Sequence, residues 1–189
     1  MLKQKSITLI TNTLILSQSK TINLVKEILP CGLKRIQIRE KSISEKLLEN
    51  FVFKLRELTL GKCELILNGS MELANKYQCD GIHVPDKSKL PNIIRKDEFP
   101  RLIIGKSIHK DYKKENKLEN LVNYVHLGPV FKTKTHPISS PICRDKIKEI
   151  CRINGLSVIL LGGINTNNLN NLINYKISGI AIMRDLLLS

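Results

Sequence analysis

The sequence has no tryptophan, and aromatic residues make up only 4% of its 189 residues. Proteins that stack single-stranded nucleic acid on aromatic side chains need more of them, so this composition argues against that class. Acidic residues are also few: 17 Asp and Glu stand against 31 Lys and Arg, a formal net charge of +14. The lysines are spread along the chain, and the densest cluster, KDYKKENK at 110–117, contains acids and no nucleic-acid motif. We therefore expect small anionic substrates rather than nucleic acid.

Long apolar runs and paired cysteines are absent as well. No segment approaches the roughly 18 uninterrupted apolar residues of a membrane span. The start, MLKQKSITLITNTLIL, resembles a signal peptide only partly, because Thr and Asn interrupt its apolar part and no small-residue cleavage site follows. There is no CxxC pair among Cys31, Cys63, Cys79, Cys143 and Cys151. We therefore expect reduced thiols in a cytoplasmic protein with no membrane partner.

The length suits one domain over residues 1–189. Eight short runs typical of β-strands alternate with segments of helical spacing or composition. The runs are 6–12, 34–39, 63–68, 80–84, 102–107, 123–130, 157–163 and 178–183. The helical segments are 20–29, 43–60, 70–78, 87–96, 114–121, 144–153 and 166–175, and only RDLLLS follows the last strand. This order predicts an α/β fold, a compact (β/α)8 TIM barrel with a truncated final helix. An open doubly wound sheet is the alternative, but it does not explain the count of eight.

One hexapeptide, IQIREK at 36–41, places two cations at a strand end. Side chains alternate along a strand, so Gln37, Arg39 and Lys41 share one face. Two charges would be costly in a packed core, and that face must meet solvent, a partner or a charged ligand. Taken alone, the hexapeptide favours a solvated strand end. In a barrel, however, ligands bind at the carboxyl ends of the strands, which favours a charged ligand.

Two further strand ends suit phosphate. LLGGIN at 160–165 has paired glycines, whose bare amides, with a helix beginning near Thr166 or Asn167, would form an anion site. A tight turn that needs positive φ explains the same glycines. GPVFKTKTH at 128–136 offers the hydroxyls of Thr133 and Thr135, although a polar surface loop would look the same.

The histidines and acids give fewer signals. His83 and His126 lie within strands and are best interpreted as structural, His109 is ambiguous, and His136 alone has a favourable position at a strand end. The sequence contains no HExxH motif and no obvious Ser-His-Asp spacing. Paired carboxylates are also missing, because Glu40 is the only acid at these strand ends before Asp86.

Taken in order, these strand-end segments resemble the thiamine phosphate synthase family and the related thiazole tautomerases. The resemblance covers nearly the whole chain and is specific because every segment lies on a successive strand end. The matching segments are QIREK (37–41), LILN (65–68), DGIHV (80–84), IGKSIH (104–109), YVHLGPVFKTKT (124–135), LLGGI (160–164) and GIAIM (179–183).

The resemblance implies that a pyrimidine diphosphate is coupled to a thiazole phosphate, with release of pyrophosphate and formation of thiamine phosphate. Arg39 and Lys41 would hold and activate the diphosphate, because negative charge grows on it as it leaves. The implied catalytic residues are Arg39, Lys41, Asn68, Ser107 and His136. The implied substrate-binding residues are Gln37, Ile38, Glu40, Thr133, Lys134, Thr135, Gly162, Gly163, Met183 and Arg184.

The chain departs from the family pattern mainly at the metal site. The two aspartates that bind Mg²⁺ in the family correspond to Gly69 and Ser88, which leaves Asp86 as the implied ligand. The lysine after the threonines is His136, and the serine at strand eight is Arg184. A thiazole tautomerase, which needs no metal, or a catalytically weakened paralogue that binds phosphate ligands is the alternative function. A tautomerase would be expected to carry a histidine near Pro129, and none is there. The sequence leaves a homo-oligomer open.

Overall fold

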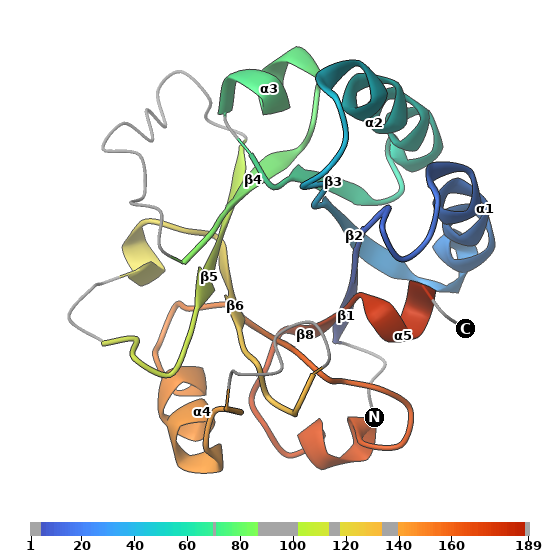
Figure 1. Cartoon of the computed structure of the whole chain (residues 1–189). Coiled ribbons are helices and arrows are strands. Elements are labelled where there is room, and N and C mark those ends of the chain that lie inside the picture. Colours follow the sequence, from blue (N-terminus) through green and yellow to red (C-terminus); the bar gives the residue numbers. More distant parts are fainter. Residues whose placement is uncertain (1–4, 70, 87–101, 114–117, 134–139, 188–189) are drawn as a thin grey trace.

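The eight β-type runs form a closed barrel of parallel strands, viewed along its axis in Figure 1. The computed structural model describes residues 5–69, 71–86, 102–113, 118–133 and 140–187. Each strand pairs with its neighbours in chain order, and β1 closes the ring against β8. The strands are β1 Ser6–Ile10, β2 Leu33–Ile38, β3 Glu64–Leu67, β4 Gly81–Val84, β5 Ile103–Ile108, β6 Tyr124–Leu127, β7 Val158–Leu161 and β8 Gly179–Ile182. The predicted fold class is confirmed.

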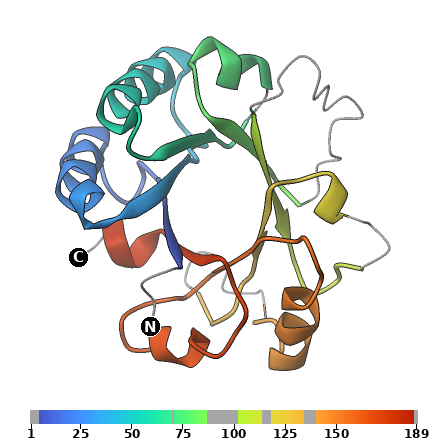
Figure 2. The same ribbon diagram turned by 180° about the vertical axis from the view of Figure 1, so that it is seen from behind.

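The helices lie around the outside of the barrel (Figure 2). They are α1 Gln18–Ile28, α2 Glu45–Thr59, α3 Met71–Lys76, α4 Arg144–Cys151 and α5 Arg184–Leu187, with 3-10 segments η1 Leu29–Cys31, η3 Leu118–Asn120 and η4 Leu169–Leu172. In α2, Phe51 and Leu55 are one turn apart and are fully buried against the barrel. The side chain of Ser44 caps this helix by accepting a hydrogen bond from the Leu47 amide at 3.4 Å. The short α5 is the predicted truncated final helix.

The prediction of a helix over 166–175 is wrong, because the structure has only the 3-10 segment η4 there. Asparagine side chains compete for the backbone groups that an α-helix would use. Oδ1 of Asn165 accepts hydrogen bonds from the amides of Asn167 and Asn168, and Nδ2 of Asn168 donates to the Gly163 carbonyl at 2.7 Å. In the predicted 114–121 helix, the described part holds only η3. The predicted 87–96 helix lies outside the described residues.

Alternating strand residues divide between two hydrophobic clusters. The larger cluster fills the layer between strands and helices, and the smaller one, inside the barrel, contains Ile10, Tyr124, Ile159 and Ala181. Gly105 makes room for the Tyr124 ring, since a Cβ atom at Gly105 would lie 2.1 Å from Cζ of Tyr124. This space allows large polar side chains to reach the middle of the barrel.

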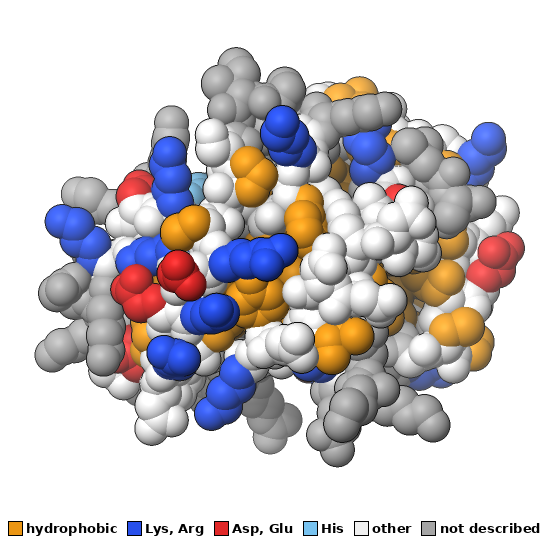
Figure 3. All heavy atoms as spheres, turned by 90° about the horizontal axis from the view of Figure 1, so that it is seen from below, with side chains coloured by type: hydrophobic (Ala, Val, Ile, Leu, Met, Phe, Trp, Pro, Cys, Tyr) orange, Lys and Arg blue, Asp and Glu red, His pale blue; other side chains and the backbone are white. Residues whose placement is uncertain are grey.

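Charges of both signs cover the face that carries α4 (Figure 3). They include the ion pair between Lys146 and Glu149 at 2.8 Å. All five cysteines are free, as predicted, and burial raises the pKa of the Cys63 and Cys79 thiols to about 12. Within the described residues, no helix has the length and apolar character to cross a membrane.

Candidate active site

The carboxyl ends of the eight strands form one rim of the barrel, and the loops that follow them meet there. Most of the predicted site residues belong to this rim. Those within the described residues are Gln37, Ile38, Arg39, Glu40, Lys41, Asn68, Ser107, Thr133, Gly162, Gly163, Met183 and Arg184, with Asp86 after β4. Ser88, Lys134, Thr135 and His136 lie outside the described residues, and their roles stay predictions.

Along the end of β2, the polar side chains become more exposed toward the rim. Gln37 is buried inside the barrel, Arg39 is partly buried and Lys41 is exposed. Burial lowers the pKa of the Arg39 guanidinium, although the nearby Glu40 carboxylate raises it. Arg39 nevertheless stays charged, because arginine is not deprotonated in proteins. The side chain of Ile38 is buried between strands and helices, so only its backbone faces neighbouring strands.

Glu40 lies in a pocket of hydrogen-bond donors from the loop after β1. Its Oε1 accepts a hydrogen bond from Oγ1 of Thr11 at 2.5 Å. Its Oε2 accepts from the backbone amide of Thr13 at 2.8 Å and from the Thr13 hydroxyl at 2.6 Å. Thr11 Oγ1 also accepts from the Arg39 amide at 3.2 Å. The Glu40 carboxylate therefore ties the first two loops together and holds the backbone beside Arg39.

The ends of β3 and β4 lack a group of metal ligands. Gly69 has no side chain to offer, and the described residues contain no group of three or more His, Cys, Asp or Glu that could hold a metal ion. Nζ of Lys106 donates to the carbonyls of Pro85 and Asp86 at 3.2 and 3.1 Å. Burial lowers the pKa of Lys106, while the Asp86 carboxylate raises it. The Lys106 ammonium group therefore lies against the backbone of the turn that carries Asp86.

The side chain of Ser107 contacts His83 inside the barrel. Its Oγ atom lies 2.9 Å from Nε2 of His83, whose Nδ1 lies 3.1 Å from the Tyr124 hydroxyl. Burial, together with the nearby cations Arg35, Lys106 and Arg39, lowers the pKa of His83 to about 3. His83 is therefore neutral at physiological pH. The His126 ring lies against it, with ring centroids 4.5 Å apart.

The loops after β6 and β7 approach each other at the paired glycines. Gly162 and Gly163 have φ values of +96° and +68°. A Cβ atom on Gly163 would lie 2.3 Å from the carbonyl oxygen of Lys132. The amide of Phe131 donates to the Gly162 carbonyl at 3.0 Å, whereas no residue of the described chain accepts a hydrogen bond from the Gly163 or Ile164 amide. Because η4 replaces the predicted helix, these loop amides, and no helix N-terminus, lie at the paired glycines.

The end of β8 contributes Met183 and Arg184. Nδ2 of Asn12, in the loop after β1, lies 3.8 Å from Sδ of Met183 and donates to it. Nε of Arg184 is buried and has no hydrogen-bond partner among the described residues. A buried cationic donor without a partner is costly, so it suits an anionic ligand. His109 is exposed, and its Nδ1 donates to the carbonyl of Gly128.

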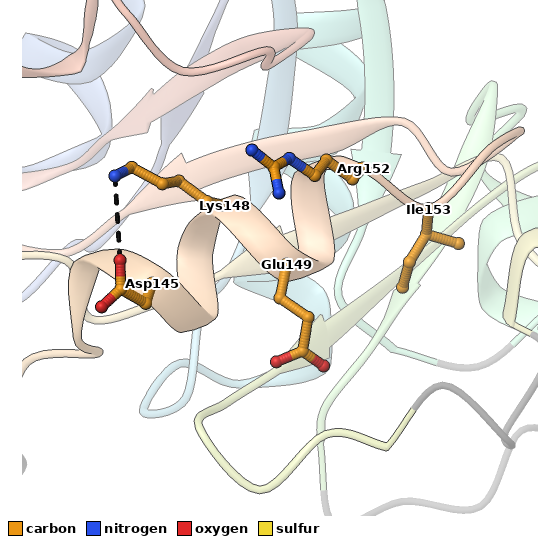
Figure 4. Close-up of a pocket in the computed structure, with 5 residues that line it drawn as sticks. All are labelled: Asp145, Lys148, Glu149, Arg152 and Ile153. Atoms are coloured by element: carbon orange, nitrogen blue, oxygen red, sulfur yellow. Dashed lines mark ion pairs between the residues drawn. The ribbon is translucent and has the colours of Figure 1, made fainter.

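One surface pocket lies away from this rim, on the outer face of α4. Figure 4 shows its lining, Asp145, Lys148, Glu149, Arg152 and Ile153. Lys148 and Asp145 pair within it at 3.7 Å. Its charged groups come from successive turns of one exposed helix, so they form a solvated face rather than part of the candidate active site.

Sequence reasoning did not find three residues at the site: Thr11, Thr13 and Tyr124. Thr11 and Thr13 follow β1 in ITNT, a polar strand end like the others, and that position was the available signal. Tyr124 begins β6 and pairs in register with Gly105. A glycine opposite a large aromatic residue was the signal there, but it is readable only when the register is known.

Known proteins resemble this chain over most of its length. The family model described as thiamine monophosphate synthase matches residues 7–186. A thiamine-phosphate synthase of Picrophilus torridus is 32% identical over 163 residues, which cover 85% of this chain and 79% of that protein. One from Methanococcus maripaludis strain C5 is 31% identical over 167 residues, which cover 87% of this chain and 80% of that protein.

A solved structure shares the fold. The thiamine phosphate pyrophosphorylase of Pyrococcus furiosus superposes with a TM-score of 0.77 at 24% identity, covering 97% of this chain and 91% of that one. The family match spans every strand that contributes to the rim, from β1 to β8. The chain belongs to the thiamine monophosphate synthase family.

Proposed function

We propose that the protein is a transferase that couples 4-amino-5-hydroxymethyl-2-methylpyrimidine diphosphate to a thiazole phosphate, forming thiamine phosphate and pyrophosphate. The main observation is the pair of cations at the end of β2, Arg39 partly buried and Lys41 exposed at the rim. The names of the relatives, thiamine-phosphate synthases, support the same reaction. The substrates are small and phosphorylated, and we place the reaction in the cytoplasm.

The chemistry explains why fixed cations are needed. When the bond between the pyrimidine methylene carbon and the diphosphate oxygen breaks, its electron pair leaves with the pyrophosphate, and the methylene carbon becomes electron-deficient. The thiazole nitrogen then bonds to that carbon. Arg39 and Lys41 would stabilise the charge that develops on the leaving group. Asn68 and Ser107, at the ends of β3 and β5, would contact the pyrimidine substrate.

The thiazole phosphate would bind on the opposite side of the rim. The amides of Gly163 and Ile164 have no acceptor within the described chain, and the buried Nε of Arg184 is also without one. Backbone amides and a guanidinium group together suit a phosphate dianion. Thr133, at the end of the β6 loop, would add a hydroxyl to the same site.

Magnesium does not fit the described residues as a protein-held ion. Position 69 lacks a carboxylate, and the Lys106 ammonium contacts the two carbonyls of the turn that carries Asp86. Mg²⁺ is normally held by one or two carboxylates plus substrate phosphates, and Asp86 alone would have to supply the protein's share. We therefore propose that Arg39 and Lys41, rather than a metal ion held by the protein, neutralise the charge of the diphosphate.

The tautomerase alternative is not favoured. The relatives at about a third identity are named as synthases. A tautomerase would be expected to carry a histidine near Pro129, but this chain has a proline there, in the loop after β6. A protein that binds the thiazole phosphate but forms no thiamine phosphate would instead match the alternative of a catalytically weakened paralogue.

The test is thiamine phosphate formation by the purified protein from the two substrates. We expect Arg39→Ala to lower kcat/KM by about 10²- to 10³-fold, the usual loss when one group that stabilises a developing anion is removed. Arg152→Ala, on the exposed face of α4, is the matched control and should leave the rate unchanged. No coupling by the wild-type protein, or full activity of the Arg39→Ala variant, would contradict the proposal.

A further inference from the structure

A chain of polar side chains runs through the inside of the barrel and ends at Ser107. Below it, Nε and Nη2 of Arg35 donate to one carboxylate oxygen of Glu64 at 2.8 and 2.5 Å. The Arg35 guanidinium also lies over the Tyr124 ring, 4.0 Å from its centroid. The Tyr124 hydroxyl then meets His83, and His83 meets Ser107. The chain therefore connects the floor of the barrel to its catalytic rim.

The burial of this chain determines which atom donates at each contact. His83 and Tyr124 are each 1% exposed, and among the described residues the Tyr124 hydroxyl has no hydrogen-bond partner except Nδ1 of His83. If Nδ1 carried the proton, it would donate to Tyr124, and the phenolic proton would have no acceptor. When Tyr124 donates to Nδ1, the phenolic proton is satisfied. A neutral imidazole has one N–H group, so its proton must then be on Nε2.

The surroundings of Tyr124 keep its phenolic proton in place. Burial raises the pKa of Tyr124, the Arg35 guanidinium over the ring lowers it, and the Glu64 carboxylate raises it. Tyr124 is therefore a protonated phenol that can donate to Nδ1 of His83. His83 cannot satisfy both sides by taking a second proton, because its burial among cations keeps it neutral. Nε2 therefore donates to Oγ of Ser107.

We propose that Tyr124 and His83 are positioning residues that fix the Ser107 hydroxyl as a hydrogen-bond donor toward the substrate. With Oγ accepting from His83, the serine proton is the free end of the chain, and Ser107 lies partly exposed at the carboxyl end of β5. The partner of this proton is therefore a hydrogen-bond acceptor, such as a ring nitrogen or a phosphate oxygen. The proposal rests on the proposed function only for the identity of that substrate.

The first experiment needs no substrate. In protein labelled with ¹⁵N-histidine, the chemical shifts of the two ring nitrogens distinguish the tautomers, and the His83→Gln spectrum identifies the His83 signals. We expect a neutral His83 with the proton on Nε2 from about pH 5 to pH 8. A proton on Nδ1, or a doubly protonated ring in this range, would overturn the proposal. This result does not depend on whether the protein makes thiamine phosphate.

The second experiment links the tautomer to catalysis. Tyr124→Phe keeps the ring under Arg35 and removes only the hydroxyl, so we expect mixed His83 tautomers and a kcat about tenfold lower, the worth of roughly one hydrogen bond, with KM for the thiazole phosphate unchanged. His83→Gln, which can still donate an N–H to Ser107, should retain more activity than His83→Leu. Tyr175→Phe, between η4 and β8, is the control and should match the wild type. A Tyr124→Phe variant with wild-type kcat and a single Nε2–H tautomer would overturn the proposal.

Discussion

Oγ1 of Thr11 donates a 2.5 Å hydrogen bond to Oε1 of Glu40, and this contact joins the loops that follow β1 and β2. The sequence suggested Glu40 as a substrate-binding residue. Its two oxygens, however, already accept three hydrogen bonds from Thr11 and Thr13. We therefore expect Glu40 to hold the loop backbone that carries Arg39 and Lys41 rather than to bind the substrate directly.

The first prediction concerns this carboxylate. Glu40→Ala should lower kcat/KM for the pyrimidine diphosphate by about tenfold or more, because the loss of charge-assisted hydrogen bonds, each worth roughly 1.5–3 kcal/mol, frees the Arg39 backbone. The kcat/KM of Glu40→Gln should lie between those of the wild type and Glu40→Ala, since the amide nitrogen of glutamine cannot accept a hydrogen bond from Thr13. Steady-state kinetics measure the effect. Glu57→Ala, an exposed position on α2, is the control, and equal losses in both variants would contradict the assignment.

The barrel was predictable because its signals are local. Short Ile- and Leu-rich runs alternate with amphipathic segments, and that alternation predicts a parallel sheet covered by helices. The placement of Arg39 and Lys41 at a strand end followed from the two-residue period of β2. Their position at the rim then depended only on the fold class.

Long-range contacts were not predictable from the sequence. The Glu40 pocket joins residues 27 and 29 positions apart, and His83 meets Tyr124 across 41 positions. These pairs depend on strand register, which composition does not specify. The error at 166–175 has a different cause, since the spacing of Leu and Ile suggested a helix while the Asn165 and Asn168 side chains captured its backbone.

The second prediction concerns magnesium. Free protein should show no saturable Mg²⁺ binding below about millimolar concentration by titration calorimetry, because no group of three or more possible ligands converges among the described residues. Gly69→Asp should create measurable binding. The glycine has no positive φ, and a Cβ there would meet only Leu67 side-chain atoms at 3.5 Å, an ordinary contact. Gly69→Asn is the matched variant without the charge. Tight Mg²⁺ binding by the wild type would show that a metal site exists after all.

The third prediction concerns the paired glycines. Gly163→Ala should weaken binding of the thiazole phosphate and lower the melting temperature, because its Cβ would collide with the Lys132 carbonyl at 2.3 Å in addition to the strain of positive φ. Gly32→Ala separates these effects. Gly32 has a φ of +92° and open space around its Cβ position, so this control carries the strain alone. If both variants bind the phosphate like the wild type, the amides after β7 do not form its site.

The last prediction concerns stability against pH. Burial lowers the pKa of His83 from 6.5 to about 3 and that of His126 well below its ordinary value. Above pH 6.5 both rings are neutral in the folded and unfolded states, so they add no pH dependence. As the pH falls through 6.5 the unfolded chain takes up protons that the folded barrel excludes, so stability falls with a slope that approaches about 1.4 kcal/mol per pH unit for each histidine.

Urea unfolding between about pH 6.5 and pH 5 measures this slope, because most carboxylates stay ionised in that interval. His83→Gln should reduce the slope of the free energy of unfolding against pH by the contribution of one histidine. This holds whatever the substitution does to stability at neutral pH. A wild-type slope near zero would mean that His83 and His126 accept protons inside the folded barrel. In that case the same burial could not hold His83 neutral beneath Ser107.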